Sequence, residues 1–110
     1  MIKFLLTTLF FPLCVLANPS PERQQQLKHL LKHDCGACHG LTLKGGLGSS
    51  LLAKDLQHKT DEFLIATILK GRKDTAMPPW ENFLTEDEAT WLVKVLRNTQ
   101  STTNIIEKGR

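Results

Sequence analysis

The sequence predicts an all-α fold with three main helices. Three segments, at about residues 21–34, 61–70 and 86–98, carry apolar residues at helical spacing, and each follows a residue that can cap a helix. No segment shows the strict alternation of polar and apolar residues that marks a half-buried strand. Four glycines and two serines within residues 40–50 predict a loop between the first two helices.

The first helix is expected to begin after a short Pro-Ser-Pro linker. Ser20 can accept a hydrogen bond from an amide of the first turn, and Pro21 suits the first helical position, where no amide is needed. Leu27, Leu30 and Leu31 then form the apolar stripe of this helix.

The second helix carries signals at both ends. Thr60 is the expected cap, Asp61 and Glu62 suit the positive end of the helix dipole, and Gly71 ends the helix. Its apolar stripe is Leu64, Ile65, Ile68 and Leu69.

The third helix opens with a capping box, in which Thr85 pairs with Glu88 three residues later. It is expected to continue to about Asn98, with an apolar stripe of Ala89, Trp91, Leu92, Val95 and Leu96.

The chain is expected to divide into four parts. Residues 1–17 are typical of a signal peptide that is removed, because Lys3 precedes an apolar run that ends near a small-residue cleavage site at Ala17. Residues 18–21 form a linker, 22–98 one folded domain and 99–110 a polar tail. A retained membrane anchor is the alternative for the first part. Its apolar run is shorter than the about 20 residues that a spanning helix needs, and Pro12 interrupts it.

Charge and cysteine content narrow the functions further. The net charge is +3, and it falls to about +2 when Lys3 leaves with the signal, which is too weakly basic for a nucleic-acid-binding protein. Cys14 would be removed too, because Leu13 is not the small residue that precedes a lipoprotein cysteine. A domain this small often needs a cross-link or a cofactor. The remaining Cys35 and Cys38 lie too close together to cross-link a fold, so they are expected to hold something.

Residues Cys35-Gly36-Ala37-Cys38-His39 match the attachment motif of a covalent haem. Two thiols separated by two residues can form thioethers with the two vinyl groups, and the next residue, His39, then ligates the iron. Three alternatives explain these residues less well. A zinc site would need a second pair of ligands, which His29, His33 and His58 do not form. A redox-active dithiol would follow a strand, and a plain disulfide would leave His39 unexplained.

Met77 is the candidate for the second axial ligand. It is the only methionine left after the signal is removed, and Pro78 and Pro79 stiffen its loop. A thioether favours ferrous iron, which raises the reduction potential and suits an electron carrier. The alternatives are that Met77 fills the core and that His58 is the ligand.

These features resemble the small class I cytochromes c over residues 22–98. The resemblance rests on the first helix ahead of Cys35-x-x-Cys38-His39, on Met77-Pro-Pro-Trp80, and on the closing helix. The segments 35–48, 64–72 and 77–80 are also similar to the periplasmic cytochrome encoded with the cd-type nitrite reductase of denitrifying bacteria. The resemblance implies a class I cytochrome c fold, with three main helices around one covalently bound haem c.

The resemblance also implies contacts around that haem. The first and last helices would cross beside it, through Leu27, Leu30, Leu31, Trp91, Leu92 and Val95. A backbone carbonyl of the stretch Gly48-Ser49-Ser50-Leu51 would accept the His39 Nδ1 proton, although serine stands here where the family has proline. Arg72 and the Trp80 indole are expected to contact the haem propionates; a solvated arginine and a core tryptophan are the alternatives.

The expected function is single-electron transfer in the periplasm, and no enzyme activity is expected, because both axial positions of the iron are filled. The resemblance implies that the protein donates electrons to the cd-type nitrite reductase or to the system that matures its special haem. Lys44, Lys70, Arg72 and Lys73 could steer an acidic partner. We expect a monomer that binds no nucleic acid. The alternatives are a haem-based gas sensor or peroxidase-like protein with a labile sixth ligand, and a redox-inactive assembly factor.

Overall fold

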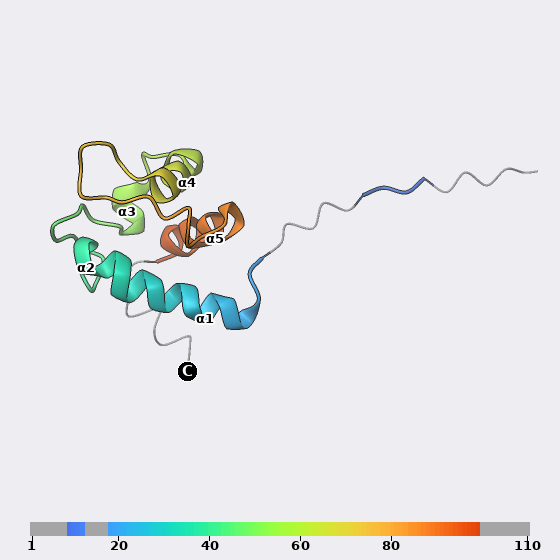
Figure 1. Cartoon of the computed structure of the whole chain (residues 1–110), viewed down its shortest axis with the longest axis horizontal. Helices are drawn as coiled ribbons and strands as arrows, with labels where there is room; N and C mark the ends of the chain where they lie inside the picture. Colours follow the sequence, from blue (N-terminus) through green and yellow to red (C-terminus); the bar gives the residue numbers. More distant parts are fainter. Residues whose placement is uncertain (1–8, 13–17, 100–110) are drawn as a thin grey trace, which may run out of the picture.

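The structure is a computed structural model, and it describes residues 9–12 and 18–99. Within these residues all regular structure is helical, which confirms the all-α prediction. Figure 1 shows α1 along one side of the molecule, with α5 beside it and α3 and α4 on the far side of α5. Most of the expected signal peptide, with Cys14, lies outside the described residues, and so does the expected tail apart from Thr99.

One continuous helical stretch leads to the haem motif. Helix α1 spans Pro21–Leu30, a π-helical segment η1 follows at Leu31–Cys35, and α2 spans Gly36–His39. The Ser20 hydroxyl accepts a hydrogen bond from the amide of Arg23 at 3.2 Å, as its expected cap role requires. The predicted end near Asp34 is wrong, because the chain stays helical through His39 by way of the wider π-helical turn.

The second and third predicted helices have the bounds that their capping signals indicate. Helix α4 spans Asp61–Lys70, with Thr60 capping its start and Gly71 following its end. Helix α5 spans Glu86–Arg97 and begins with the complete capping box of Thr85 and Glu88. A short helix, α3 at Ala53–Leu56, was not predicted.

Leucines make most of the core. The buried cluster draws on every helix except the short α2, and on the loops between them. The residues expected where the first and last helices meet all belong to this cluster or pack against it, although Trp91 and Val95 are only half-buried. Val93, which was not predicted, is 1% exposed. The cluster consists of Leu27, Leu31, Leu43, Leu52, Leu56, Leu64, Leu84, Leu92, Val93 and Leu96.

Two arginines connect elements that are distant in the sequence. Arg23 of α1 pairs with Glu88 of α5, and its Nη2 donates to the carbonyl of Phe83 at 3.3 Å. Arg97, at the other end of α5, donates to the carbonyl of Leu56 at 2.7 Å and pairs with Asp61 at 2.9 Å. Both ends of α5 are therefore fixed to the rest of the domain.

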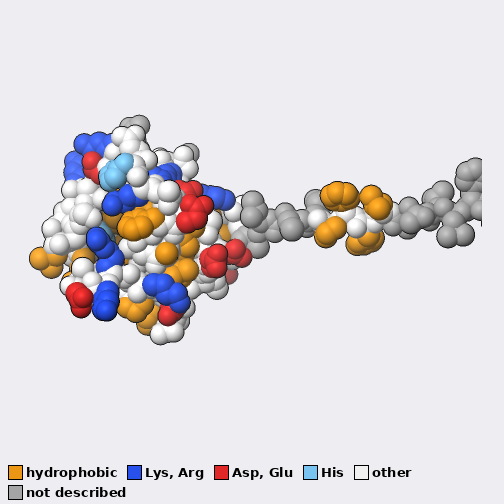
Figure 2. Space-filling view, turned by 90° about the horizontal axis from the view of Figure 1, so that it is seen from above, with side chains coloured by type: hydrophobic (Ala, Val, Ile, Leu, Met, Phe, Trp, Pro, Cys, Tyr) orange, Lys and Arg blue, Asp and Glu red, His pale blue; other side chains and the backbone are white. Residues whose placement is uncertain are grey.

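The face drawn in Figure 2 has no large patch of only positive or only negative charge. Basic, acidic and exposed apolar side chains are interspersed on it. This distribution agrees with the low net charge of +3. No helix within residues 9–12 and 18–99 has both the length and the apolar character that crossing a membrane requires.

Candidate haem site

The π-helical segment and α2 place the motif residues at the end of the first helical stretch. Cys35 closes the π-helical turn and is half-buried, whereas Cys38 and His39 lie in the following turn, with Cys38 exposed. Both thiols are free. A widened turn of this kind often occurs at a functional site. The two thiols are thus displayed one turn apart, as thioether bonds to one flat molecule require.

The acidity of Cys35 argues against a redox-active dithiol. Burial raises the pKa of its thiol to about 11, and the nearby charge of Asp34 adds to the effect. A nucleophilic cysteine in a redox motif needs a lowered pKa, because the thiolate is the reactive form. The raised pKa therefore gives no support to a redox-active dithiol at this position.

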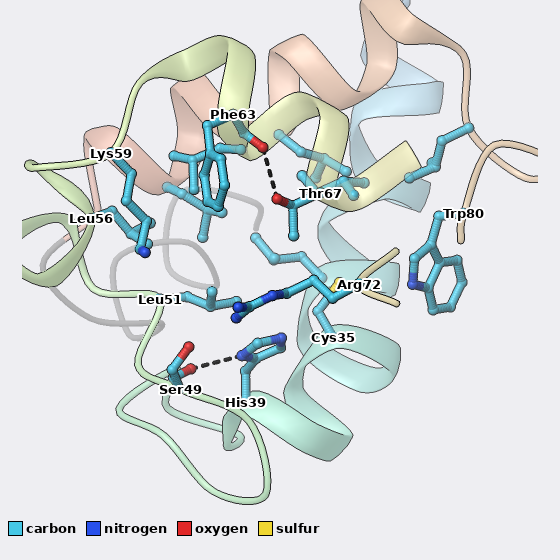
Figure 3. A pocket seen from close by; sticks show the side chains of 16 residues that line it. Cys35, His39, Ser49, Leu51, Leu56, Lys59, Phe63, Thr67, Arg72 and Trp80 are labelled. Atoms are coloured by element: carbon cyan, nitrogen blue, oxygen red, sulfur yellow. Dashed lines mark hydrogen bonds between the residues drawn. The ribbon is translucent and has the colours of Figure 1, made fainter. Parts of the chain in front are cut away.

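His39 is oriented by the loop that follows it. Its Nδ1 lies 2.7 Å from the carbonyl oxygen of Ser49 (Figure 3), and the α-carbon of Gly48 sits so close to the imidazole that a β-carbon there would meet the ring at 2.8 Å. A carbonyl only accepts, so Nδ1 carries the proton and Nε2 keeps its lone pair. The imidazole can then ligate iron through Nε2. The expected carbonyl partner is confirmed, with serine in place of proline.

An apolar cavity opens beside His39 and Cys35. The empty space in it, counted together with the solvent at its mouth, is about 810 Å³. The walls include leucines of the core, contributed by η1, α3, α4, the segment before α5, and α5 itself. Cys35, His39, Arg72 and Trp80 stand at its polar edges (Figure 3). Apolar walls with a thiol and an imidazole at one side fit a large flat ligand such as haem.

Met77 lies across an adjoining cavity from the motif. This cavity, of about 960 Å³, is lined by Cys35, Cys38, His39 and Met77 among others. The loop is fixed to the end of α4, since the amide of Arg72 donates to the carbonyl of Met77 at 3.1 Å and that of Trp80 donates to Ile68 at 3.0 Å. The structure thus brings the two expected iron ligands to one cavity, although 37 residues separate them in the sequence.

Arg72 and Trp80 line both cavities. Figure 3 shows the Arg72 side chain extending into the cavity, and the Trp80 indole nitrogen on the cavity side of its ring. Within the described part of the chain, no carboxylate pairs with the Arg72 guanidinium; the ion pairs are those of Arg23, Lys70 and Arg97. A cation and an N–H donor are therefore available to an anionic ligand group.

The other histidines of the sequence, which are alternative metal ligands, do not line either cavity. His58 is exposed and is not among the residues that line these cavities. The rings of His29 and His33 stack on each other, with centroids 4.2 Å apart, on exposed positions of α1 and η1. In the described ranges, no three His, Cys, Asp or Glu side chains are arranged to hold a metal ion, so a structural zinc site has no support.

Three residues of the cavity wall were not predicted from the sequence. Lys59, Phe63 and Thr67 also line it, and the Thr67 hydroxyl donates to the carbonyl of Phe63 at 2.7 Å. Phe63 and Thr67 stand one turn apart on α4, next to Leu64 and Ile68 of the predicted stripe. A wider stripe on this helix would have included both.

Comparisons with known proteins identify the family of this chain. A protein-family model described as cytochrome c oxidase, cbb3-type, subunit III matches residues 22–94. A cytochrome c55X of Pseudomonas aeruginosa is 55% identical over 84 residues, which are 74% of this chain and 71% of that protein. A cytochrome c55X of Paracoccus denitrificans is 42% identical over 97 residues, covering 88% of this chain and 94% of its own.

Two solved structures are also similar to this chain. The c-type cytochrome NirC is similar with a TM-score of 0.72 and 52% identity, over 73% of this chain and 94% of that chain. The dihydro-heme d1 dehydrogenase NirN, in complex with DHE, has a TM-score of 0.59 and 33% identity over 64% of this chain, but only 15% of its own. The predicted class I cytochrome c fold is confirmed. The chain belongs to the c-type cytochromes, the family that binds haem c covalently through Cys-x-x-Cys-His.

Proposed function

We propose that this protein is an exported single-electron carrier, in which Cys35 and Cys38 hold one haem c and His39 and Met77 ligate its iron. One observation carries the proposal: His39 and Met77 line the same cavity as the two thiols. Haem iron supplies the redox chemistry, because it takes up and releases one electron. With an imidazole on one side and a thioether on the other, no coordination position is left for a substrate.

The chain's own residues define the environment of that chemistry. The leucine walls exclude water, which lowers the reorganisation that accompanies a change of charge. The Met77 thioether favours the ferrous state and the hydrogen bond of His39 opposes it, so the two together set the potential. The Arg72 guanidinium and the Trp80 indole N–H bind the propionates in this proposal.

The partner we propose is the cd-type nitrite reductase or the system that matures its special haem, to which this protein donates electrons. Support comes from the relatives: one similar structure is named as NirC, and another as a dihydro-heme d1 dehydrogenase, NirN. A dehydrogenation releases electrons to an acceptor, so this name supports a link with the same haem system and not the direction of electron flow. The part of NirN that resembles this chain is 15% of its length. A small cytochrome of the same type suits exchange with such enzymes.

We further propose that residues 1–17 are removed on export, that residues 18–21 form a linker ahead of a haem domain at 22–98, and that 99–110 form a polar tail. The protein then works in the periplasm as a monomer. The family match begins at residue 22, which supports this division. The mass of the exported protein should correspond to residues 18–110 plus one haem. A mass that includes residues 1–17 would contradict the proposed cleavage.

The ligand assignment is tested by substitution of Met77. The native ferric protein should show the absorption band of methionine–iron charge transfer, and Met77→Ala should lose it and have a lower potential, because the thioether no longer stabilises ferrous iron. His58→Ala is the matched control and should keep both properties, since His58 is exposed and outside the cavities. Absence of the band in the native protein would instead favour a gas sensor or a peroxidase-like protein.

The proposed partner is tested by mixing the reduced protein with it. Reduced protein, mixed with purified oxidised cd-type nitrite reductase in a stopped-flow instrument, should become oxidised as the reductase becomes reduced. The Met77→Ala variant should transfer electrons with a different equilibrium constant, because its potential differs. No transfer from the native protein at micromolar concentrations would count against this partner, and would favour an assembly factor whose haem is structural.

A further inference from the structure

The carbonyl of Ser49 is held in place by very little apolar packing. Gly45, Gly46 and Leu47, which precede it, are exposed, and Ser49 itself is exposed. Leu47 is 95% exposed, and it lines the cavity proposed for haem, so the rest of the protein gives it little packing. Within the protein itself, hydrogen bonds are therefore the main contacts that position a carbonyl lying 2.7 Å from His39 Nδ1.

Backbone hydrogen bonds from the amides of Gly48 and Leu51 hold the residues on either side, and the next residue, Ser50, adds the side-chain bonds. Its hydroxyl donates to Asp55 Oδ2 at 2.6 Å and accepts from the amide of Leu52 at 3.2 Å. The hydroxyl also lies 3.4 Å from the carbonyl of Leu43, a residue that is fully buried. The Ser50 side chain thus connects the end of the glycine-rich loop to Leu43, Leu52 and Asp55.

Asp55 is exposed, but it belongs to α3, whose Leu56 is 3% exposed in the core. Arg97 of α5 donates to the carbonyl of Leu56 at 2.7 Å, so α3 is attached to the longest helix of the domain. A continuous set of contacts therefore runs from α5 through α3, Asp55 and Ser50 to the carbonyl that orients His39.

We propose that Ser50 and Asp55 are positioning residues that set the reduction potential by fixing the hydrogen bond between Ser49 and His39. This inference rests on the proposed function, in which His39 ligates the iron. A strong bond from Nδ1–H to a carbonyl makes the imidazole a better electron donor, which stabilises ferric iron and lowers the potential. When the Ser49 carbonyl is free to move, the bond weakens and the potential rises.

The test compares Ser50→Ala with Ser50→Thr in the haem-loaded protein. Ser50→Ala removes the hydroxyl without changing any charge, and should shift the equilibrium with a fixed redox dye at least threefold toward the reduced protein. That is about 28 mV, at 59 mV per tenfold change for one electron. Ser50→Thr keeps the hydroxyl and should retain the native potential. Equal potentials for native protein and Ser50→Ala would overturn the proposal.

A second measurement reports the hydrogen bond itself. In the reduced protein, the His39 Nδ1–H proton should exchange with solvent severalfold faster in Ser50→Ala than in the native protein, as seen by NMR. This proton is observed whichever group occupies the sixth position. If Met77 proves not to be a ligand, the proposed ligation fails, but exchange still tests the role of Ser50. Unchanged exchange, in a protein that shows the methionine–iron band, would overturn the inference and leave the proposed function intact.

Asp55 is tested through a double-mutant cycle. Asp55→Ala alone should raise the potential, and Ser50→Ala combined with Asp55→Ala should add little beyond Ser50→Ala, because both remove the same contact. Asp55→Asn removes the charge but keeps an acceptor, so it should shift the potential less than Asp55→Ala. Equal shifts in these two variants would assign the effect to charge and contradict a positioning role.

Ser20→Ala is the control for a general loss of stability of the fold. This variant also removes one hydroxyl that accepts an amide hydrogen bond, from Arg23 at the start of α1. It should lower stability while leaving both the potential and the exchange of the His39 proton unchanged. A shift in Ser20→Ala as large as that in Ser50→Ala would show that the potential responds to loosening anywhere in the fold.

Discussion

At the scale of single residues, Glu88 serves two structures at once. Its Oε1 accepts from the amide of Thr85 at 3.0 Å, which completes the capping box of α5, and its other oxygen accepts from the Arg23 guanidinium of α1. The hydrogen bond from Arg23 lowers the pKa of this carboxyl, while partial burial opposes the shift. The ionised form is thus the form that the fold stabilises.

This pKa shift predicts how stability depends on pH. A carboxylate whose pKa is lowered by folding contributes its full stabilisation above the ordinary value of 4.5, and loses it as the pH falls through the folded value. Glu88→Gln should therefore be less stable than the native protein at pH 7, and the difference should shrink toward pH 3. Urea unfolding across this range measures it. A difference that stays constant from pH 7 to pH 3 would contradict this role of the Glu88 carboxylate.

At the scale of elements, the end of α4 determines where Met77 lies. Gly71 follows the helix with a φ of 69°, a left-handed conformation that favours glycine. A β-carbon at this position would meet the carbonyl oxygen of Met77 at 2.7 Å and the backbone of Pro78 and Pro79 at 2.8 Å. The Met77 loop can lie against α4 only because residue 71 has no side chain.

We therefore expect Gly71→Ala to affect stability and ligation together. Strain and collision should lower the free energy of unfolding by more than about 1 kcal/mol and weaken the methionine–iron band. Gly45→Ala is the matched control: its φ is 113°, but its β-carbon would meet no atom closer than 3.5 Å. It should lower stability and keep the band. Loss of the band in both variants would contradict a specific role for Gly71.

The capping signals explain which elements could be predicted from the sequence. Helices α4 and α5 begin at capping residues that can be recognised in the local sequence. These residues are Thr60 for α4 and Thr85 with Glu88 for α5, and both helices were predicted correctly. Helix α3 follows Leu52, which offers no side-chain cap, and its position depends on contacts with α5 that no local pattern records. The π-helical turn at Leu31–Cys35 likewise leaves no signal in the spacing of apolar residues.

At the scale of the whole molecule, cations stand near the cavity although the overall charge is small. Arg72 and Lys73 line a surface hollow of about 660 Å³ together with Phe63, next to the cavity that holds His39. Lys70 also lines it, but its ammonium pairs with Glu81 at 2.5 Å. Because the Arg72 guanidinium is assigned to the propionates, a partner with acidic groups would meet mainly Lys73 on this side.

This arrangement predicts a salt-dependent rate of electron transfer. With the nitrite reductase as partner, Lys73→Gln should have a lower second-order rate constant than the native protein at low ionic strength. The difference should vanish near 1 M salt, where the Debye length is about 3 Å. Lys94→Gln, an exposed position of α5 outside the cavity linings, is the control and should behave as native. Equal rates for both variants at every salt concentration would exclude steering by Lys73.

The candidate site was predictable where chemistry fixes the residue type. Cys35, Cys38 and His39 form a contiguous motif, and Met77 was identified as the only remaining methionine. Ser50 and Asp55 form no such motif: they are five residues apart, and only the folded chain shows that their side chains meet at 2.6 Å. Candidate cofactor-binding residues can thus be found by type, whereas the residues that hold them in place are set by tertiary structure.

The leucines around the cavity have a further consequence for how this protein can be altered. Leu31, Leu56, Leu64, Leu84, Leu92 and Leu96 belong both to the core and to the cavity wall. We therefore expect substitutions among them to change stability and, with haem in the cavity, the reduction potential as well. The side chains of Ser50 and Asp55 belong neither to this core nor to the cavity wall. Substitutions at those two residues should alter the potential with a smaller loss of stability.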